Sequence, residues 1–287
     1  MKRFVFLCLL LVSTRCFAQI DNFKLAMSFY DKGSYEKAFE YMEKSANEGS
    51  IGAQYTLGSY YAIGIGVTKN LSKAMEWWQK AADQGHPMSM FHLGEEYLEG
   101  GDGVIIDKQK AIYWLTKATD YDNLEAASLL SDCYRLGNGV PKNIKKSISL
   151  LENIINSDKD GFQDTKINAE LQLAAIYMDD ELVRDYAKAH YYSLKAAESG
   201  NPTGMYFVGM DYCQERGVPK DIKESVKWIT LGADLGHPEC QFQLHLYYKL
   251  GIGVEKNSKK ANELFDKAYK GGSLRAVQLL MDMYGPQ

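Results

Sequence analysis

A motif that returns every 36 or 37 residues constrains the fold of this chain more than any other feature. One position of the motif, which stands just before a small residue, recurs at these intervals except between Lys117 and Lys195. That slot is filled by Lys44, Lys80, Lys117, Lys195, Leu231 and Lys267. A period of this length is typical of repeat proteins, in which each unit buries its apolar side only by stacking on its neighbours. The sequence therefore predicts an array of repeats.

Each unit is predicted to consist of two helices, and the stretch 53–85 is the fullest copy. In its first helix Ala53, Leu57 and Tyr61 fall on one face at helical spacing. Gly58 lies on the same face and should let the partner helix come close. A Gly-x-Gly-Val loop ends this helix, and the second helix runs from near Ser72 to a terminal glycine. Neither helix can bury its apolar side alone.

Two residues of this copy, Trp78 and His86, also suit an active site, and the repeat decides how we interpret them. The slot of Trp78 is filled in other units by Trp114, Leu151, Tyr192, Trp228 and Phe265. We therefore expect Trp78 in the core. His86 stands in a Gly-His-Pro turn between helices, and His237 stands in an identical turn. A residue that recurs with its turn is expected to serve the turn.

The repeat boundaries follow from aligning the copies. The units are predicted near 23–49, 53–85, 89–123, 126–160, 167–200, 204–236 and 240–272, with a terminal helix at 274–284. The segment 156–166 adds about seven residues to the usual turn, and the unit that begins at Ala169 lacks the Gly-x-Gly loop. The array should be least regular there, where a change of curvature or a flexible join is expected.

The first 18 residues are predicted to be a cleaved signal peptide. A basic start at Lys2 and Arg3 is followed by an apolar run over 4–12 and by Cys16-Phe17-Ala18, an acceptable cleavage site. The run is too short for a membrane helix, which needs roughly 20 apolar residues. The mature chain, 19–287, is expected in the periplasm or outside the cell. Acylation of Cys16 and a retained anchor were the alternatives.

Charge and cysteine content exclude several classes of function. Loss of residues 1–18 removes three basic residues and no acidic one, which leaves 30 basic against 37 acidic residues and a net charge of −7. We therefore expect no nucleic acid as a partner, and the lysine clusters at 141–147 and 255–260 are interpreted as solvated helix starts. Cys133, Cys213 and Cys240 remain, an odd number without CxxC spacing, so neither a disulfide framework nor a zinc finger is predicted.

The sequence offers no catalytic constellation, and we predict neither an enzyme, a cofactor nor a metal site. The five histidines, His86, His92, His190, His237 and His245, show no metal-ligand spacing. A meeting of His86 with His92 at a repeat junction was the one metal alternative. The Gly-x-Gly-Val loops close a helix, whereas a phosphate-binding loop opens one, so the loops are interpreted as structural.

The motif "LGSYYAIGIGV" followed by "KAMEWWQKAADQG" resembles the Sel-1-like repeat family, which is related to tetratricopeptide repeats. The resemblance covers nearly all of the mature chain. It implies an all-α fold, a right-handed α-solenoid of about six helix-turn-helix repeats plus a C-terminal capping helix. It also implies a role in binding other proteins. One branch of the family carries a cysteine pair in each repeat and has been associated with β-lactam binding, but this sequence has no such pairs.

A partner-binding surface is predicted on the first helices, which should line the concave side of the array. Its positions lie two, six and nine residues after the small residue, away from the packed stripe. The candidates are Tyr55, Ser59, Phe91, Glu95, Asp132, Arg135, Tyr206, Met210, Phe242 and Leu246. The four aromatic residues share one slot and are equally suited to packing between units. Glu95, Asp132, Arg135 and Met210 are therefore the better candidates for partner contact.

These observations predict an exported scaffold or adaptor that binds a partner polypeptide. Two alternatives remain at this point. One is an exported hydrolase or small-ligand-binding protein of the cysteine-rich, β-lactam-binding type, and the other is a structural spacer in an envelope complex. No membrane span is expected after signal removal. Self-association is expected at the C-terminal end, where Leu279, Leu280 and Met283 are thinly covered.

Overall fold

The computed structural model describes residues 22–284, and the predicted signal peptide at 1–18 lies outside this range. Within the described part the regular structure is helical, with one isolated bridge between Gly101 and Val104. A helix over 22–31 comes first. It is followed by α2 (Tyr35–Asn47), α3 (Ile51–Ile63), α4 (Leu71–Asp83), α5 (Pro87–Glu99), α6 (Lys108–Asp120), α7 (Leu124–Leu136), α8 (Ile144–Ile155), α9 (Gln163–Asp179), α10 (Tyr186–Glu198), α11 (Pro202–Gln214), α12 (Ile222–Asp234), α13 (Pro238–Leu250), α14 (Ser258–Lys270) and α15 (Leu274–Tyr284).

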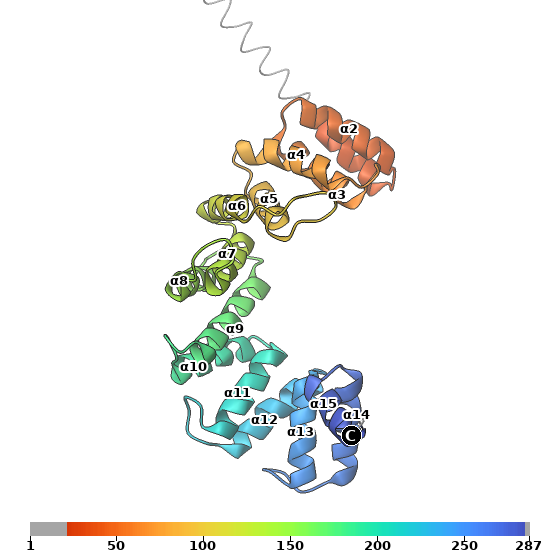
Figure 1. Ribbon diagram of the computed structural model, residues 1–287. Coiled ribbons are helices and arrows are strands. Elements are labelled where there is room, and N and C mark those ends of the chain that lie inside the picture. The colour runs from red at the N-terminus through yellow and green to blue at the C-terminus, as the bar shows by residue number, and fades with distance from the viewer. Residues whose placement is uncertain (1–21, 285–287) are drawn as a thin grey trace, which may run out of the picture. The chain divides into compact units, whose positions relative to one another are not determined.

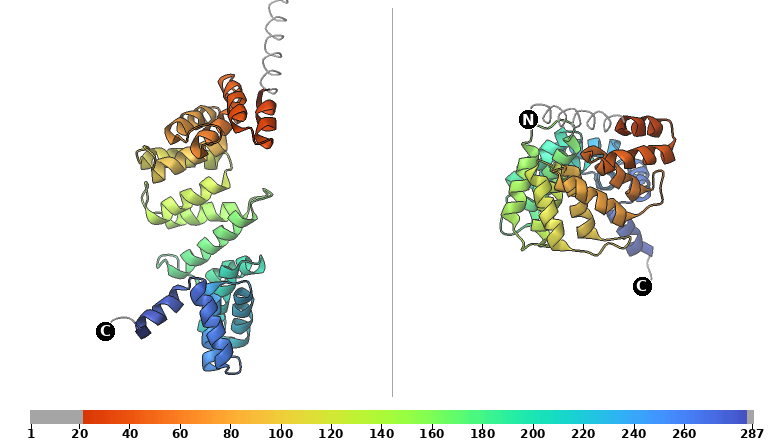
Figure 2. Two further views of the ribbon diagram at one scale, coloured as in Figure 1. Left: turned by 90° about the vertical axis from the view of Figure 1, so that its right-hand side faces the viewer. Right: turned by 90° about the horizontal axis from the view of Figure 1, so that it is seen from above.

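The helices form consecutive pairs, as the repeat predicts. α3 packs on α4, α5 on α6, α9 on α10, α11 on α12 and α13 on α14 (Figure 1). Each pair also packs on the pair that follows it within the same compact unit. The contacts divide the chain into two such units, one up to Leu150 and one from Leu151, and the pairs of each can be followed by colour in Figure 2. With the helix at 22–31 and α2, the described residues contain seven helix pairs followed by α15. The predicted all-α solenoid is confirmed.

The turns between pairs are built on helix N-caps. The small residue that opens the repeat motif is the third residue of the first helix, and its backbone N–H is bound by the side chain three positions earlier. The cap residues are Ser50, His86, Asn123, Asn201, His237 and Ser273. Because the predicted units were counted from the small residue, most first helices begin two residues before the predicted range, as α3 does at Ile51.

Two glycines mark where neighbouring helices come closest. A Cβ on Gly58 would lie 2.5 Å from Cδ1 of Trp78, so the glycine makes room for an indole that is only 3% exposed. Gly66 has a φ of +66°, and a Cβ there would lie 2.1 Å from the carbonyl oxygen of Tyr35 in the preceding pair. Trp78 is therefore core, as predicted, and the structure adds that the Gly-x-Gly loop makes a contact between repeats.

The unit after the insertion differs from the others in the expected place. α9 has 17 residues where most helices have 13, because part of the segment 156–166 continues the helix at its start. At its other end Asp180 is extended, with φ −80° and ψ 117°, where α3 and α7 end on left-handed glycines. The insertion is thus partly helical and not simply a longer turn. The change of curvature stays a prediction.

Candidate partner-binding surfaces

The aromatic slot of the first helices packs against the next repeat. The ring of Tyr55 lies 4.6 Å from that of His86 and 6.0 Å from that of His92, both in the following pair. The ring of Tyr206 lies 6.0 Å from His237 in the same relation. Phe91 is half-buried against the core of the first unit. These rings cover the junctions between repeats, which limits what they offer to a partner.

Phe242 is the most buried residue of this slot. It is 5% exposed and packs in a cluster with Ala268 and Ala276. The guanidinium of Arg275 lies over its ring at 4.9 Å. Nη1 of Arg275 also donates to the hydroxyl of Tyr206 at 3.3 Å and to Oε1 of Gln243 at 3.0 Å. Phe242 therefore serves packing, and its predicted contact with a partner loses its basis.

The two aliphatic candidates of the second unit differ in their surroundings. Leu246 is half-buried and packs against the cluster of Phe242, Ala268 and Ala276. Met210 is half-buried on α11. Truncation or charge at Leu246 would therefore disturb packing as well as surface, whereas Met210 is the better position for testing a surface role.

The polar candidates of the first unit are held by neighbours on their own helices. Asp132 accepts from Nη2 of Arg135 at 2.7 Å and from its Nε at 3.1 Å. Oε2 of Glu95 lies 3.4 Å from Nδ1 of His92. The hydroxyl of Ser59 donates to the carbonyl of Tyr55 at 3.2 Å. Asp132, Arg135 and Glu95 are 33%, 38% and 37% exposed, so each can exchange its local partner for a group on another protein.

The histidines of the Gly-His-Pro turns act as caps, as predicted. Nδ1 of His86 accepts from the N–H of Ser89 at 3.2 Å, and Nδ1 of His237 accepts from the N–H of Cys240 at 3.3 Å. Burial lowers the pKa of both imidazoles, which favours the neutral form that a cap needs. His92 stacks on Trp78 at 4.8 Å. Over the described residues, no three side chains of His, Cys, Asp and Glu are grouped as a metal site requires.

A buried histidine–aspartate pair in the second unit was missed by sequence analysis. Nδ1 of His190 lies 3.1 Å from Oδ2 of Asp211, which is 1% exposed. Oδ1 of the same carboxyl is buried without a hydrogen-bond partner. Burial raises the pKa of Asp211, and the hydrogen bond from His190 opposes this shift. The slot of Asp211 is filled by Tyr60, Cys133, Ile176 and Tyr247 in four other repeats and by a second carboxylate, Glu96, in a fifth, so the sequence pattern alone does not single out Asp211.

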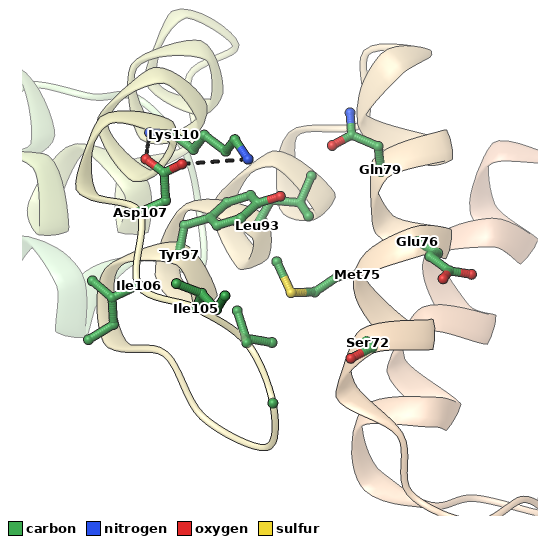
Figure 3. Close-up of a pocket in the computed structure, with 12 residues that line it drawn as sticks. Ser72, Met75, Glu76, Gln79, Leu93, Tyr97, Ile105, Ile106, Asp107 and Lys110 are labelled. Atoms are coloured by element: carbon green, nitrogen blue, oxygen red, sulfur yellow. Dashed lines mark hydrogen bonds and ion pairs between the residues drawn. The ribbon is translucent and has the colours of Figure 1, made fainter.

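A cavity of about 580 Å³ lies between α4 and the loop that joins α5 to α6. α4 contributes Met75 to one wall, and α5 contributes Leu93 and Tyr97 to the other (Figure 3). The loop closes the cavity with Ile105, which is 85% exposed, and Ile106, which is 53% exposed. This site was also missed by sequence analysis.

The loop sequence contains the signal that could have found this cavity. After Gly-Val the other loops continue with Thr68-Lys69, Pro141-Lys142, Pro219-Lys220 or Glu255-Lys256. This loop alone among the five has two isoleucines at those positions. It is also one residue longer, and Gly101 and Val104 form a bridge at its tip. Replacement of a lysine by an exposed apolar residue is typical of a surface that binds another molecule.

Comparison with protein families identifies the repeat. The family model for the Sel1 repeat matches residues 22–50, 51–86, 87–120, 124–154, 167–201, 202–237 and 238–273. The chain belongs to the Sel1 repeat family. Its seven matched repeats correspond to the seven helix pairs of the structure.

Two characterised proteins are similar over much of the chain. Chitin synthase regulator SKT5 of Saccharomyces cerevisiae is 26% identical over 89% of this chain and 38% of its own length. Cytochrome c oxidase assembly factor 7 of Xenopus tropicalis is 35% identical over 70% of this chain and 72% of its own. The match to the first of these thus spans well under half of the relative.

Solved structures share the fold. A protective antigen of uropathogenic Escherichia coli, c5321, aligns with a TM-score of 0.79 at 24% identity over 93% of this chain and 56% of its own. A Sel1 repeat protein from Oxalobacter formigenes aligns with a TM-score of 0.69 at 26% identity over 86% and 96%. Sel1 repeat proteins are generally adaptors that bind protein partners, and these matches indicate no catalytic family.

None of the helices between residues 22 and 284 has the length and apolar character of a membrane span.

Proposed function

We propose that this Sel1 repeat protein is an exported scaffold that binds a partner polypeptide through its first helices. The observation that carries the proposal is that the two faces of each first helix have different roles. One face of each first helix is committed to packing, and the variable slots that hold Glu95, Asp132, Arg135 and Met210 stay partly exposed. A set of variable side chains on an invariant framework is the arrangement that repeat proteins use to select partners.

Export is part of the proposal and is supported by the sequence at 1–18, with its basic start, apolar run and Cys16-Phe17-Ala18 site. We propose the periplasm or the cell exterior as the place of action. Fusion of residues 1–30 to a reporter that is active only after export tests this step. Replacement of the apolar run 4–12 by serine and glycine should hold the reporter inside the cell. Export that survives this replacement would contradict the proposal.

Affinity capture tests the binding role. Residues 19–287 with a C-terminal tag are expected to recover a stoichiometric companion from native envelope extract, and Met210→Asp should reduce the yield at least fivefold. Met210→Leu, which keeps an apolar side chain of similar volume, is the matched control and should recover the companion in full. A companion that is recovered equally with Met210→Asp would remove α11 from the binding surface. Recovery of no companion by the unaltered chain would contradict the scaffold role.

A further inference from the structure

The cavity beside α4 has two walls of different character. Leu93, Tyr97 and Ile105 make one side apolar, and Met75 projects from α4 toward Tyr97 (Figure 3). Ser72 and Gln79 lie one turn to either side of Met75 on α4 and line the same cavity. The volume of about 580 Å³ is in the range of sites that enclose a ligand group. The site therefore pairs an apolar socket with a row of hydrogen-bonding side chains.

The spacing of that row matches an extended polypeptide. Ser72 and Gln79 are seven residues apart, which is about 10 Å along the helix axis at a rise of about 1.5 Å per residue. Three residues of an extended chain span roughly the same distance. A peptide that runs along α4 can thus present a backbone or side-chain group to each of these residues in turn.

The charges of the lining residues favour a basic segment. Lys110 is the one base among the twelve residues that line the cavity, and its Nζ lies 3.5 Å from Oδ2 of Asp107 and over the ring of Tyr97. Glu76 stands at the rim and points away from Met75 in Figure 3. The nearest lysines of α4 are directed to aromatic rings, with Nζ of Lys73 over Tyr61 and that of Lys80 over Trp77. Glu76 is therefore the one charged lining residue outside that ion pair, and a partner chain would reach its carboxylate where it crosses the outer edge of α4.

The neighbouring helix adds to the negative potential. Glu95, Glu96 and Glu99 stand together near the end of α5, which forms the apolar wall. The pKa of Glu96 is raised, first by burial and then by the carboxylates of Glu95 and Glu99. These carboxylates lie outside the lining of the cavity and add only to the negative potential of α5, which His92 and Lys69 oppose.

The loop is held in place over the cavity. Oδ2 of Asp102 at its tip lies 2.8 Å from Nζ of Lys69 in the preceding loop. The side chain of Ile106 rests on Gly100, where a Cβ would lie 2.7 Å from Cγ1 of the isoleucine. Ile105 is left without cover, at the mouth of a cavity that has an apolar wall behind it. The apolar mouth is thus exposed before any partner arrives.

We propose that this cavity binds an extended segment of a partner protein, with one apolar side chain between Met75, Tyr97 and Ile105 and a lysine or arginine beside Glu76. The inference rests on the proposed scaffold function, but it concerns residues other than Met210. A failure here would leave the capture experiment with Met210→Asp unaffected, so the two can be told apart.

Peptide selection tests the inference. A random dodecapeptide library displayed on phage is selected on residues 19–287, and the enriched peptides are labelled and titrated by fluorescence anisotropy. We expect the enriched sequences to share an apolar residue with Lys or Arg within two positions. Ile105→Thr with Ile106→Lys restores the sequence of a typical loop, Gly-Val-Thr-Lys-Asp, and should raise the dissociation constant at least tenfold.

Two further variants distinguish the effect of charge from nonspecific hydrophobic binding. Glu76→Lys should raise the dissociation constant of a Lys-containing peptide about fivefold. The same variant should bind the peptide more tightly when the lysine of the peptide is replaced by glutamate. Leu250→Ser removes an apolar side chain that is 62% exposed on α13 and should leave the dissociation constant unchanged. The thermal midpoint of each variant shows that the array is folded.

Several results would overturn the inference. These are enrichment of no peptide, a dissociation constant for the Ile105→Thr, Ile106→Lys variant within twofold of the original, or an enriched motif with acidic residues beside the anchor. Binding of a small apolar dye that the loop variant abolishes, without any selected peptide, would assign the cavity to a small molecule instead.

Discussion

Nδ1 of His86 accepts a hydrogen bond from the backbone N–H of Ser89 at 3.2 Å, and this bond starts α5. The Oγ of Ser89 lies 3.0 Å from the same nitrogen. A protonated imidazole carries a hydrogen on both nitrogens and cannot accept. His237 has the same role for α13. The two junctions between repeats therefore depend on neutral histidines.

This dependence predicts a loss of stability in mild acid. Because the pKa of His86 and of His237 is lowered below the usual 6.5 by burial, the neutral form is favoured in the folded chain. Their contribution is present above pH 6.5 and is lost as the pH falls below that value. We expect the urea midpoint to be lower at pH 5.5 than at pH 7.5. The free energy of unfolding should fall by about 1 kcal/mol for each cap.

Asparagine supplies the control for this prediction, since Asn123 and Asn201 fill the same cap position and do not titrate. The double variant His86→Asn, His237→Asn should lose less stability over the same pH range. Part of the pH dependence should remain, because burial also lowers the pKa of His245. An unchanged pH dependence in the double variant would refute the capping account.

The buried pair of His190 and Asp211 is predicted to cost stability when only one partner is removed. His190→Ala leaves a carboxylate that is 1% exposed without its partner, and the expected loss is about 3 to 5 kcal/mol in urea unfolding at pH 7.5. Ile112 and Cys133 fill the two slots in the first unit. The double variant His190→Ile, Asp211→Cys should therefore recover most of the loss.

The pH dependence of the single variant provides a second check. Because burial raises the pKa of Asp211, its carboxyl takes up a proton at a higher pH in the fold than in the unfolded chain. The destabilisation of His190→Ala should therefore be smaller at pH 4.5 than at pH 7.5. An equal loss at both values would show that Asp211 is not the group responsible.

Alanine at Gly66 is predicted to be more damaging than at Gly33. Both glycines have positive φ, +66° and +72°, so either substitution incurs the left-handed strain of about 1 to 2 kcal/mol. Only at Gly66 would the new Cβ strike another backbone, 2.1 Å from the oxygen of Tyr35, whereas Gly33 has nothing within 4 Å. We expect Gly66→Ala to lose about 2 kcal/mol more in chemical unfolding. Equal losses would mean that the contact between repeats contributes little.

The free thiols are predicted to differ in reactivity. Burial raises the pKa of Cys133 to about 11 and that of Cys240 to about 12, so neither forms a thiolate near neutral pH. Cys213 is only half-buried. Residues 19–287 should react with a disulfide reagent at one thiol per chain at pH 7.5 and at three in urea. Cys213→Ser should abolish the native reaction, and a remaining fast thiol would contradict the burial of the other two.

The parts of the fold that repeat could be predicted from the sequence. The packed faces that hold Gly58 and Trp78, and the turn of His86, can be assigned because each position recurs at fixed spacing. The pair of His190 with Asp211 cannot, because it occurs at a single repeat junction and forms only through the packing of α10 on α11. The helical start of α9 was missed for a different reason, since an insertion was treated as a turn.

The candidate sites were harder to predict than the fold. Phe242 was placed on the binding surface by its slot, but burial depends on the side chains of α14 and α15, which the slot does not specify. The cavity beside α4 required the path of the loop at 100–107, and only Ile105 and Ile106 indicated it in the sequence.

Site-specific photo-crosslinking tests the central claim, that a partner polypeptide binds the first helices. A photoreactive phenylalanine is placed at Met210 on α11 in one chain and at Leu231, which is exposed on α12, in another. The account predicts a crosslinked partner from position 210 and none from position 231 in native envelope extract. Crosslinks from position 231 alone, or none from position 210, would contradict it.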